Sequence, residues 1–285
     1  MSFAALEPAL AVRERHLHDL LAPLDSVIVA FSGGVDSAYL AWAATRIFGP
    51  AAFCITAESP SYPDHHRQLA LRIAREFGLR HEFVRTAEMD RPEYRANPVD
   101  RCYYCKNELY DVLSRIAAER GVSAIVDGSN ADDRRDVRPG RKAAREHGVL
   151  SPLDEAGLTK ADIRELSHRA GLPTWDEPAS ACLSSRIPYD SEVTGEKLRM
   201  IERAEDVLRE LGFRVCRVRH HEAAADDRAM ARLEIGRDEM PRALQPDVRE
   251  RIVAELRAIG YRHVTIDLQG YRMGSLNEGV RLLPA

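Results

Sequence analysis

The chain has 285 residues, of which 45% are hydrophobic and 30% are charged, and its formal net charge is −4. Such a chain is long enough to bury the core of one large domain and one smaller one. The negative charge argues against a dedicated nucleic-acid binder, and the lack of a long apolar run or a signal-peptide pattern argues against a membrane protein. We therefore expect a globular cytoplasmic protein without a membrane partner.

The first expected element is a helix over residues 3–24, and a glycine turn follows it closely. Between them, residues 27–31 form a short β-branched run that is typical of a buried strand in a parallel sheet. The string SGGVDS then ends this strand and opens a helix. Its two glycines let the backbone approach an anion, and a helix N-terminus favours negative charge. The residues predicted to hold nucleotide phosphates are Ser32, Gly33, Gly34, Asp36 and Ser37.

The turn differs from the two best-known glycine loops. It lacks the GxxxxGK[ST] pattern of the Walker A loop and the GxGxxG pattern of the dinucleotide fold. A strand followed by SGGxDS resembles instead the PP-loop of ATP pyrophosphatases, which cleave ATP between its α- and β-phosphates. An ordinary strand-to-helix turn would explain the glycines but not the whole string. Asp36 is also a candidate ligand for Mg²⁺, which a crowded polyphosphate needs.

Further strands are expected over residues 51–57, 81–85 and 123–128, with helices over residues 63–78, 141–146 and 160–170. The alternation of strands and helices predicts a parallel, Rossmann-like sheet with right-handed crossovers. Because ligands bind beyond the carboxyl ends of strands in such sheets, the residues at these ends are candidates for nucleotide binding. They are Thr56, Ala57 and Glu58 on the adenosine side, and Asp127 and Gly128 where the strand over residues 123–128 runs into a polar loop. The alternative interpretation of this loop is a solvated surface loop without a ligand.

A CxxC pair, Cys102 and Cys105, lies immediately before an expected helix that runs to about Glu119. Such a pair can be redox-active, half of a metal site, or two unrelated thiols. Its position well inside the chain argues against a thioredoxin-like site, and the lack of a second pair argues against zinc. Cys54 lies in an apolar strand and is expected to be a buried packing residue.

Beyond Asp190 the periodicity changes, which predicts a PP-loop domain of residues 1–189 and a small α+β domain of residues 190–285 for substrate binding and oligomerisation. Helices are expected over residues 196–211 and 247–259, and strands over residues 214–220, 231–235 and 263–268. Arg217 and Arg219 share one strand face, which suits a substrate phosphate or a charged edge strand, and Cys216 faces the other way. Glu205 and Glu234 are weaker candidates, for a cation.

Several motifs occur in a fixed order: SGGVDS, NPxDRCYYCK, DGSNADDxxDxRPG, PASACLSSRIPY and DLxGYRxGSxN. Together they resemble the LarE family of PP-loop sulfur transferases, from about Ser26 to Asn277. The resemblance implies an ATP-dependent enzyme of nickel-pincer nucleotide cofactor synthesis. The implied substrate is pyridinium-3,5-biscarboxylic acid mononucleotide. Its carboxylates are adenylated with release of pyrophosphate and then converted to thiocarboxylates.

The resemblance also implies roles for the cysteines. Family members that sacrifice a cysteine carry it immediately before the position of Cys182, where this chain has Ala181. Members with cysteines at the positions of Cys102, Cys105 and Cys182 are expected to hold a 4Fe-4S cluster, in which one iron has no protein ligand and can carry sulfide. A cysteine pair with an unrelated third cysteine is the simpler alternative.

Acyl adenylation requires positioning and charge neutralisation more than acid–base catalysis. The candidate catalytic residues are Asp36, Lys106, Cys182, Ser185 and Arg186, and Arg186 is also a candidate substrate contact, with a surface salt bridge as the alternative. We expect ATP, Mg²⁺ and a 4Fe-4S cluster as cofactors, a small-molecule nucleotide substrate, a sulfide donor, and a homo-oligomer. The rival functions are a tRNA-thiolating PP-loop enzyme, which the negative net charge disfavours, and a non-catalytic ATP-binding regulator.

Overall fold

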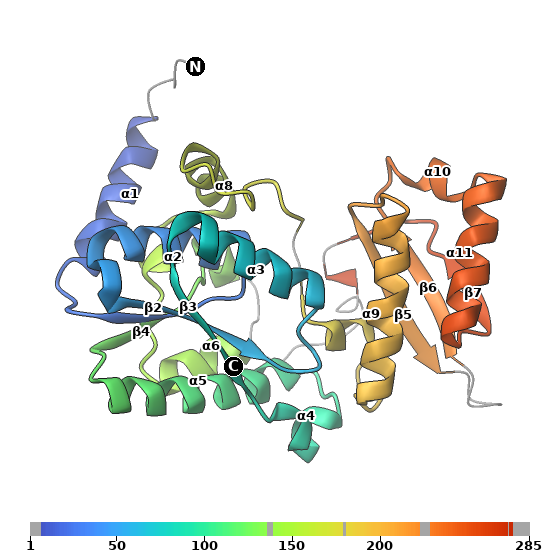
Figure 1. Ribbon diagram of the computed structural model, residues 1–285, viewed down its shortest axis with the longest axis horizontal. Helices are drawn as coiled ribbons and strands as arrows, with labels where there is room; N and C mark the ends of the chain where they lie inside the picture. The colour runs from blue at the N-terminus through green and yellow to red at the C-terminus, as the bar shows by residue number, and fades with distance from the viewer. Residues whose placement is uncertain (1–6, 136–138, 179–180, 223–228, 273, 276–285) are drawn as a thin grey trace.

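The computed structural model describes residues 7–135, 139–178, 181–222, 229–272 and 274–275. They form two parts, each built on its own β-sheet (Figure 1). The motif residues Asp136 to Arg138, Ala179, Ser180 and Asn277 lie outside the described residues. Among the helices that are described, none has both the length and the apolar character that crossing a bilayer requires.

The first sheet is parallel, and its strands lie in the order β3-β2-β1-β4. The strands are β1 (Val27–Ala30), β2 (Ala52–Glu58), β3 (Arg80–Arg85) and β4 (Ala124–Val126). In register, Val27 of β1 lies between Ala52 of β2 and Ala124 of β4. The predicted parallel α/β fold is therefore confirmed, and the carboxyl ends of β1, β2 and β4 meet at one edge of the sheet.

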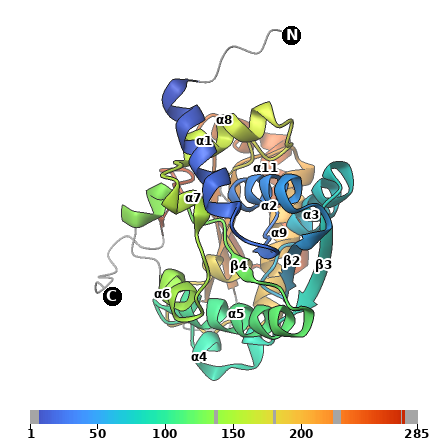
Figure 2. The same ribbon diagram turned by 90° about the vertical axis from the view of Figure 1, so that its left-hand side faces the viewer.

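Helices cover both faces of this sheet (Figure 2). One face carries α1 (Pro8–Leu21), α2 (Val35–Phe48), α3 (Asp64–Phe77) and α8 (Lys160–Arg169); the other carries α5 (Arg101–Arg120) and α6 (Pro139–Glu146). The alternation of side chains along β1 explains this layering, because Val27 and Val29 pack with the first group of helices and Ile28 packs with the second.

The second sheet has three strands in the order β5-β6-β7. Strand β5 (Cys216–Glu222) is antiparallel to β6 (Ala229–Ile235), and β6 is parallel to β7 (His263–Ile266). Helices α9 (Gly195–Glu210) and α11 (Pro246–Ile259) pack on one face of this sheet through a shared apolar core. The predicted smaller α+β part is confirmed, whereas the exact boundary at residue 190 stays a prediction.

The sequence did not predict several short helices. They are α4 (Pro92–Arg95), α7 (Pro152–Glu155), α10 (Met240–Ala243) and the 3₁₀ helix η4 (Leu183–Arg186). Of these, α7 packs in the core of the first part and α10 in that of the second, whereas α4 and η4 connect the two parts. A separate apolar cluster joins α4, η4 and α9 through Tyr94, Leu183 and Ile201. Helix α9 thus packs on its own sheet with one side and on the connecting segments with another, so it couples the two parts.

The cysteine pair lies inside a helix and not before it, as the sequence analysis had expected. Helix α5 begins at Arg101, so Cys102 and Cys105 occupy its first two turns. The amide of Arg101 already donates a hydrogen bond to the carbonyl of Pro98, which starts the helical turn one residue before the first cysteine. A spacing of three residues then puts both thiols on the same side of the helix.

Gly128 provides a direct test of how the carboxyl end of β4 meets the start of α2. A Cβ atom at Gly128 would lie 2.9 Å from the Ser37 amide nitrogen, which is backbone and cannot easily move away. We expect Gly128→Ala to lower the free energy of unfolding by about 1–3 kcal/mol, as overpacking does elsewhere. Chemical denaturation measures this change.

The matched control is Gly195→Ala at the start of α9. There a Cβ atom would lie 3.3 Å from the end of the flexible Arg199 side chain. We expect this variant to stay within about 0.5 kcal/mol of the natural chain. Equal effects of the two substitutions would show that the contact at Gly128 does not constrain the fold.

Candidate active site

The glycine turn connects β1 to α2 in a conformation that requires glycine. Gly33 has a φ of +75°, and a Cβ atom there would lie 3.3 Å from both Ala70 Cβ and the carbonyl oxygen of His66. Gly34 precedes α2 directly as its N-cap residue. The turn therefore leaves the start of α2 accessible to an anion, which both the exposed amides and the helix dipole favour.

Two serines hold the turn in shape. Ser37 Oγ donates to the carbonyl of Gly34 at 3.1 Å and accepts from the Ser32 amide at 3.1 Å. Ser32 Oγ lies 3.0 Å from Ser37 Oγ, and the Tyr62 hydroxyl donates to the Ser32 carbonyl at 3.0 Å. These bonds fix the backbone of the turn before any ligand binds, but ligation by these serines stays a prediction.

Asp36 has one oxygen engaged and one without a partner. Lys160 donates from Nζ to Asp36 Oδ2 at 2.5 Å, and Asp36 Oδ1 is buried without a hydrogen-bond partner among the described residues. A buried carboxylate oxygen without a partner carries a desolvation cost that a cation would remove. Asp36 therefore fits the predicted role of a Mg²⁺ ligand.

Lys160 is a site residue that the sequence analysis missed. It is the first residue of α8, where Thr159 and Asp162 form a capping box. A positive charge at a helix N-terminus opposes the helix dipole. An unfavourable position of this kind is a sequence signal for a functional lysine. In the structure, the Lys160 side chain lies against the glycine turn, where it pairs with Asp36.

The residues that follow β2 take different positions. Thr56 is buried, and its hydroxyl donates to the Phe31 carbonyl at 2.6 Å, so His81 Nε2, 2.8 Å away, must donate to it. Glu58 forms an ion pair with Arg67 at 2.7 Å. The side chains of Thr56 and Glu58 are therefore engaged within the protein, and adenosine recognition by Thr56, Ala57 and Glu58 stays a prediction.

Asp127 anchors the loop after β4. Its carboxylate accepts hydrogen bonds from Tyr110 at 2.9 Å, from the Ser151 hydroxyl at 2.8 Å and from the Ser129 amide at 3.1 Å. Lys106 from α5 lies over the Tyr110 ring, 5.4 Å from its centroid. The charges of Tyr110 and Asp127 raise the pKa of Lys106 above its ordinary value in spite of burial. Lys106 is therefore a cation held at the carboxyl edge of the sheet.

The three predicted cysteine ligands converge from two segments. Arg101 Nη2 lies 4.0 Å from Cys182 Sγ, and the charges of Cys182 and Cys102 raise the pKa of Arg101, although burial lowers it. Desolvation raises the pKa of Cys102 and of Cys105, and the charge of Cys182 raises both further. In the described part of the chain, however, no three His, Cys, Asp or Glu side chains form a group that could hold a metal ion.

Asn97 links these two segments. It is fully buried with a φ of +56°, and its Nδ2 donates to the carbonyls of Pro188 at 2.7 Å and Ser191 at 3.1 Å. Arg101 donates to Asn97 Oδ1 and, at 3.0 Å, to the Ser184 carbonyl. The start of α5 is therefore tied to the segment that carries Cys182. The sequence analysis missed this role, because it depends on partners about 90 residues further along the chain.

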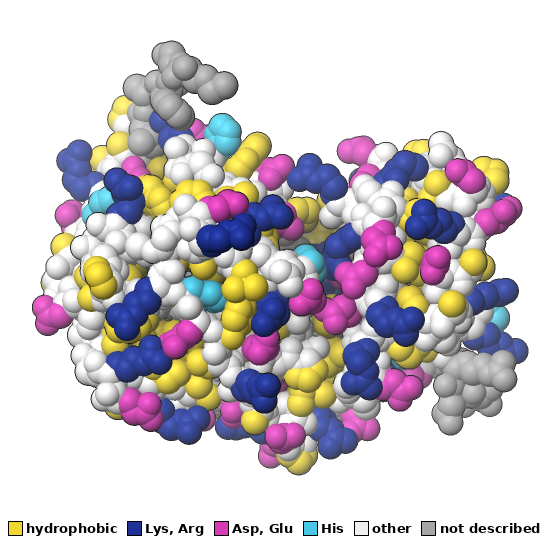
Figure 3. Space-filling model, viewed as in Figure 1, with side chains coloured by type: hydrophobic (Ala, Val, Ile, Leu, Met, Phe, Trp, Pro, Cys, Tyr) yellow, Lys and Arg dark blue, Asp and Glu magenta, His cyan; other side chains and the backbone are white. Residues whose placement is uncertain are grey.

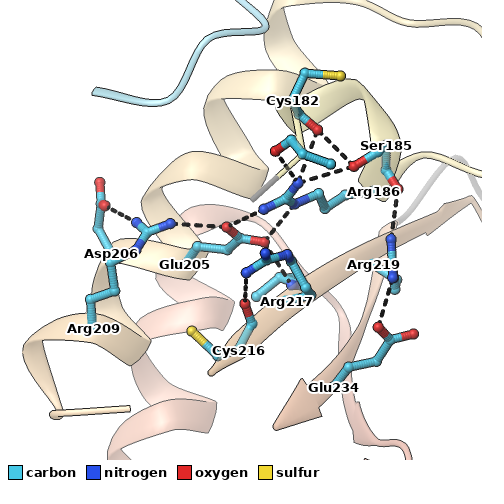
Figure 4. Close-up of polar contacts among 12 residues, drawn as sticks. Cys182, Ser185, Arg186, Glu205, Asp206, Arg209, Cys216, Arg217, Arg219 and Glu234 are labelled. Carbon is cyan, nitrogen blue, oxygen red and sulfur yellow. Dashed lines mark hydrogen bonds and ion pairs between the residues drawn. The ribbon is translucent and has the colours of Figure 1, made fainter. Parts of the chain in front are cut away.

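Arg186 is fully buried in an ion pair with Glu205 of α9 (Figure 4). Its Nε and Nη2 donate to the two Glu205 oxygens at 2.8 and 3.0 Å, and Nη1 donates to the carbonyls of Ala181 and Cys182. Despite burial, the charge of Arg186 lowers the pKa of Glu205 to about 2. Arg186 thus holds the Cys182 segment in place. The alternative interpretation, a surface salt bridge, is wrong because the pair is buried, whereas a catalytic or substrate-binding role of Arg186 stays a prediction.

The two arginines of β5 lie on the face opposite Cys216, as the alternation predicted. Arg219 pairs with Glu234 at 2.7 Å and donates to the Ser185 carbonyl at 2.6 Å (Figure 4). Arg217 donates to the carbonyl of Cys216 at 2.6 Å, and its guanidinium lies 5.2 Å from the centroid of the Tyr271 ring. Both arginines are buried, so the exposed edge-strand interpretation is wrong, whereas a substrate phosphate at this face stays a prediction.

Comparison with known proteins adds three relatives. An uncharacterized protein of Synechocystis is 42% identical over 92% of this chain and 96% of its own. The pyridinium-3,5-bisthiocarboxylic acid mononucleotide synthase of Lactiplantibacillus plantarum is 34% identical over 94% of this chain and 95% of its own. An uncharacterized protein of Methanocaldococcus jannaschii is 27% identical over 86% of this chain and 90% of its own. No protein-family model matches the chain.

The Arg186 pair yields a stability prediction. Arg186→Met leaves Glu205 buried without its bidentate partner, and breaking a buried pair in this way costs about 3–5 kcal/mol. We expect the free energy of unfolding to fall by this amount, and denaturant titration measures the change.

The control is Arg95→Met, which breaks an ion pair with Glu192 whose two side chains are about half exposed. Exposed pairs contribute about 0–1 kcal/mol, so this variant should remain close to the natural chain. If Arg186→Met were as stable as Arg95→Met, the buried pair would not anchor the Cys182 segment.

Proposed function

The chain belongs to the LarE family, and we propose that it is an ATP-dependent sulfur transferase that converts pyridinium-3,5-biscarboxylic acid mononucleotide into the bisthiocarboxylic acid. The observation that carries the proposal is the match of nearly the whole chain to the synthase of Lactiplantibacillus plantarum. The pre-formed glycine turn, with Asp36 and Lys160 beside it, supports ATP as the activating nucleotide.

The proposed reaction has two steps. A carboxylate oxygen of the substrate attacks the α-phosphorus of ATP, pyrophosphate leaves, and an acyl adenylate forms. A sulfide then attacks the acyl carbon, a thiocarboxylate forms, and AMP leaves with the electron pair of the broken C–O bond. In this scheme the glycine turn and the start of α2 bind the departing pyrophosphate through backbone amides.

Asp36 and Lys160 exchange partners in this proposal. Asp36, whose Oδ1 has no partner among the described residues, would hold the Mg²⁺ that accompanies ATP, and the ion would offset the charge of the polyphosphate. Lys160, which is held by the same carboxylate, is then released to neutralise the negative charge of the pyrophosphate.

The cysteines fit a cluster that carries sulfur. The donor set is three thiols, with Arg101 and Lys106 as neighbouring cations that offset the charge of three thiolates. When bound, such a cluster would supply an iron without a protein ligand for the transferred sulfide. Cys102, Cys105 and Cys182 would hold it, and Arg186 and Asn97 would position the Cys182 segment.

The first test of the proposal concerns the nucleotide. Asp36→Ala should abolish formation of AMP and pyrophosphate from ATP and the mononucleotide, and Lys160→Met should slow it by about 10²-fold or more, since each removes a charge from the site of pyrophosphate release. Chromatographic analysis of the nucleotide products measures both effects. Arg169→Met, at the other end of α8 where the arginine pairs with Glu165, should leave the rate unchanged. Formation of ADP and phosphate by the natural chain would exclude the proposed reaction.

The second test concerns the cluster. Protein reconstituted without oxygen with iron and sulfide should bind about four irons per chain. Cys182→Ala should lose iron and repeated turnover, whereas Cys54→Ala and Cys216→Ala, which change buried packing thiols, should keep both. Metal analysis and mass spectrometry provide the measurements. Single-turnover transfer without iron, together with loss of one H₂S from a cysteine, would contradict the cluster.

A further inference from the structure

Helix α8 carries three basic or aromatic-ring side chains along one side: Lys160, Arg164 and His168. Successive members of this set are four residues apart in the sequence, and such residues lie one helical turn apart on the same side. On the buried side of α8, Ile163 and Leu166 pack in the core of the first part together with residues of α2. Because α2 begins at the glycine turn, α8 has a fixed position relative to the proposed nucleotide site.

Arg164 holds the backbone of the segment that follows α8. We call residues 171–178 the linker, because they lead from the first part toward Cys182. Arg164 Nη1 donates to the carbonyl of Trp175 and Nη2 donates to the carbonyl of Glu177, both at 2.6 Å. One turn further along α8, the centroid of the His168 ring lies 4.5 Å from that of the Trp175 ring. One side of α8 therefore contacts the glycine turn through its first residue and the linker through the next two turns.

The other contacts of the linker are weaker. Figure 1 shows the chain passing from α8 to the second part, and Figure 3 shows the surface hollowed between the two parts. Glu177 and Pro178 line a cavity of about 270 Å³ there, and Trp175 is 41% exposed. Asp176 pairs with Arg214 of the second part, but both side chains are largely exposed, and such pairs contribute little. Two charge-assisted hydrogen bonds from one guanidinium are the stronger restraint on the backbone.

The Cys182 segment is thus held from two directions. Arg186 donates to the carbonyls of Ala181 and Cys182 and pairs with Glu205, which ties this segment to α9 of the second part. Arg164 ties the chain that precedes it to α8 of the first part. The position of Cys182 relative to the glycine turn therefore depends on both arginines.

This position matters for the second step of the proposed reaction. The acyl adenylate can react with sulfide at its acyl carbon, which gives the thiocarboxylate and AMP. Water can attack the same carbon instead, which restores the carboxylate, also releases AMP and leaves one ATP consumed without product. A displacement of about 1 Å can slow a positioned reaction by about 10²-fold, so a misplaced sulfur carrier would favour attack by water.

We propose that Arg164 is a positioning residue for sulfur transfer, because it keeps the Cys182 segment within reach of the acyl adenylate. It acts through the backbone of Trp175 and Glu177 and not on the reacting atoms. The inference rests on the proposed function and adds that α8 links its two steps, with Lys160 beside the site of adenylation and Arg164 on the path to the sulfur carrier.

The test uses the full chain, reconstituted with iron and sulfide and supplied with ATP and the mononucleotide. The natural chain should release one AMP for each thiocarboxylate formed. Arg164→Met should raise the ratio of AMP to thiocarboxylate by about threefold or more, with the rate of AMP formation close to that of the natural chain. Chromatography of the nucleotides and of the thiocarboxylate measures the ratio. A merely structural role would lower both products together and leave the ratio unchanged.

Two further variants sharpen this test. Glu165→Gln changes the neighbouring residue of α8, whose side chain is 46% exposed, and it should keep the natural ratio. Arg164→Lys retains a positive charge without the two-pronged guanidinium, so its ratio should fall between those of the natural chain and Arg164→Met. The iron content of Arg164→Met should equal that of the natural chain, because Arg186 still holds the Cys182 backbone.

Tryptophan fluorescence tests the contact itself without the reaction. The chain has two tryptophans, Trp42 and Trp175, so the Trp42→Phe background leaves Trp175 as the reporter. In that background, Arg164→Met should increase the quenching of Trp175 by acrylamide, since the linker loses its restraint, whereas Glu165→Gln should not. Equal quenching in all three proteins would show that Arg164 does not hold the linker and would overturn the inference.

The product ratio gives the remaining decisive outcomes. The inference is wrong if Arg164→Met keeps the natural ratio, if AMP and thiocarboxylate fall together, or if the variant loses iron, which would assign Arg164 to cluster retention. Failure of the proposed function is distinguishable, because the natural chain itself would then form no thiocarboxylate. That result would also remove the step that Arg164 is proposed to serve.

Discussion

The buried ion pair between Arg186 and Glu205 is the interaction on which the arrangement of the site depends. Both side chains are fully buried, and removing two charges from water is costly unless every donor and acceptor is satisfied. Here the condition is met, because the guanidinium also donates to the carbonyls of Ala181 and Cys182 and Glu205 also accepts from the Val218 amide at 3.1 Å. One pair therefore joins η4, α9 and β5 and fixes the backbone at Ala181 and at Cys182, the predicted cluster ligand.

This pair also explains why α9 is the helix that couples the two parts. Leu208 on α9 packs in the core of the second sheet, whereas Ile201 packs with Tyr94 and Leu183 in the connecting cluster. Glu205 lies on the same helix as these two apolar contacts. The position of the second sheet relative to the glycine turn thus depends on apolar packing on α9 and on this buried pair, together with contacts such as the hydrogen bond from the Asp64 amide of α3 to Glu202 Oε1 of α9 at 2.7 Å.

Local signals were enough to predict the first sheet and its glycine turn. In β1 the alternation of Val27, Ile28 and Val29 and the glycines that follow carry both the strand and the turn in the sequence itself. The start of α5 was harder, because the helix begins before the cysteine pair without a side-chain cap hydrogen bond at Asp100. Short helices such as α4 and η4 were missed, since packing stabilises them more than their own sequence does.

The roles of individual charges could not be predicted in the same way. Arg186, Arg217 and Arg219 had the pattern of ligand-binding residues, but the partners of a guanidinium lie far away in sequence, as the pairs with Glu205 and Glu234 show. Lys160 presented the opposite problem, because only the fold brings it 124 residues back to Asp36. The sequence thus indicated which charged residues lie near the site, but it did not indicate which of them form ion pairs within the protein.

The cations differ in how many of their donor atoms remain available to bind a ligand. Arg186 uses all three of its nitrogen atoms in bonds to the protein, so a ligand could reach it only by displacing Glu205 or a carbonyl group. Lys160 has three donor protons and, among the described residues, donates from Nζ to Asp36. Its ammonium can turn from a carboxylate to a phosphate without breaking any other contact recorded in the described part of the chain. Buried arginines therefore set the geometry of this site, and a partly exposed lysine is the cation best placed to respond when charge develops on the nucleotide.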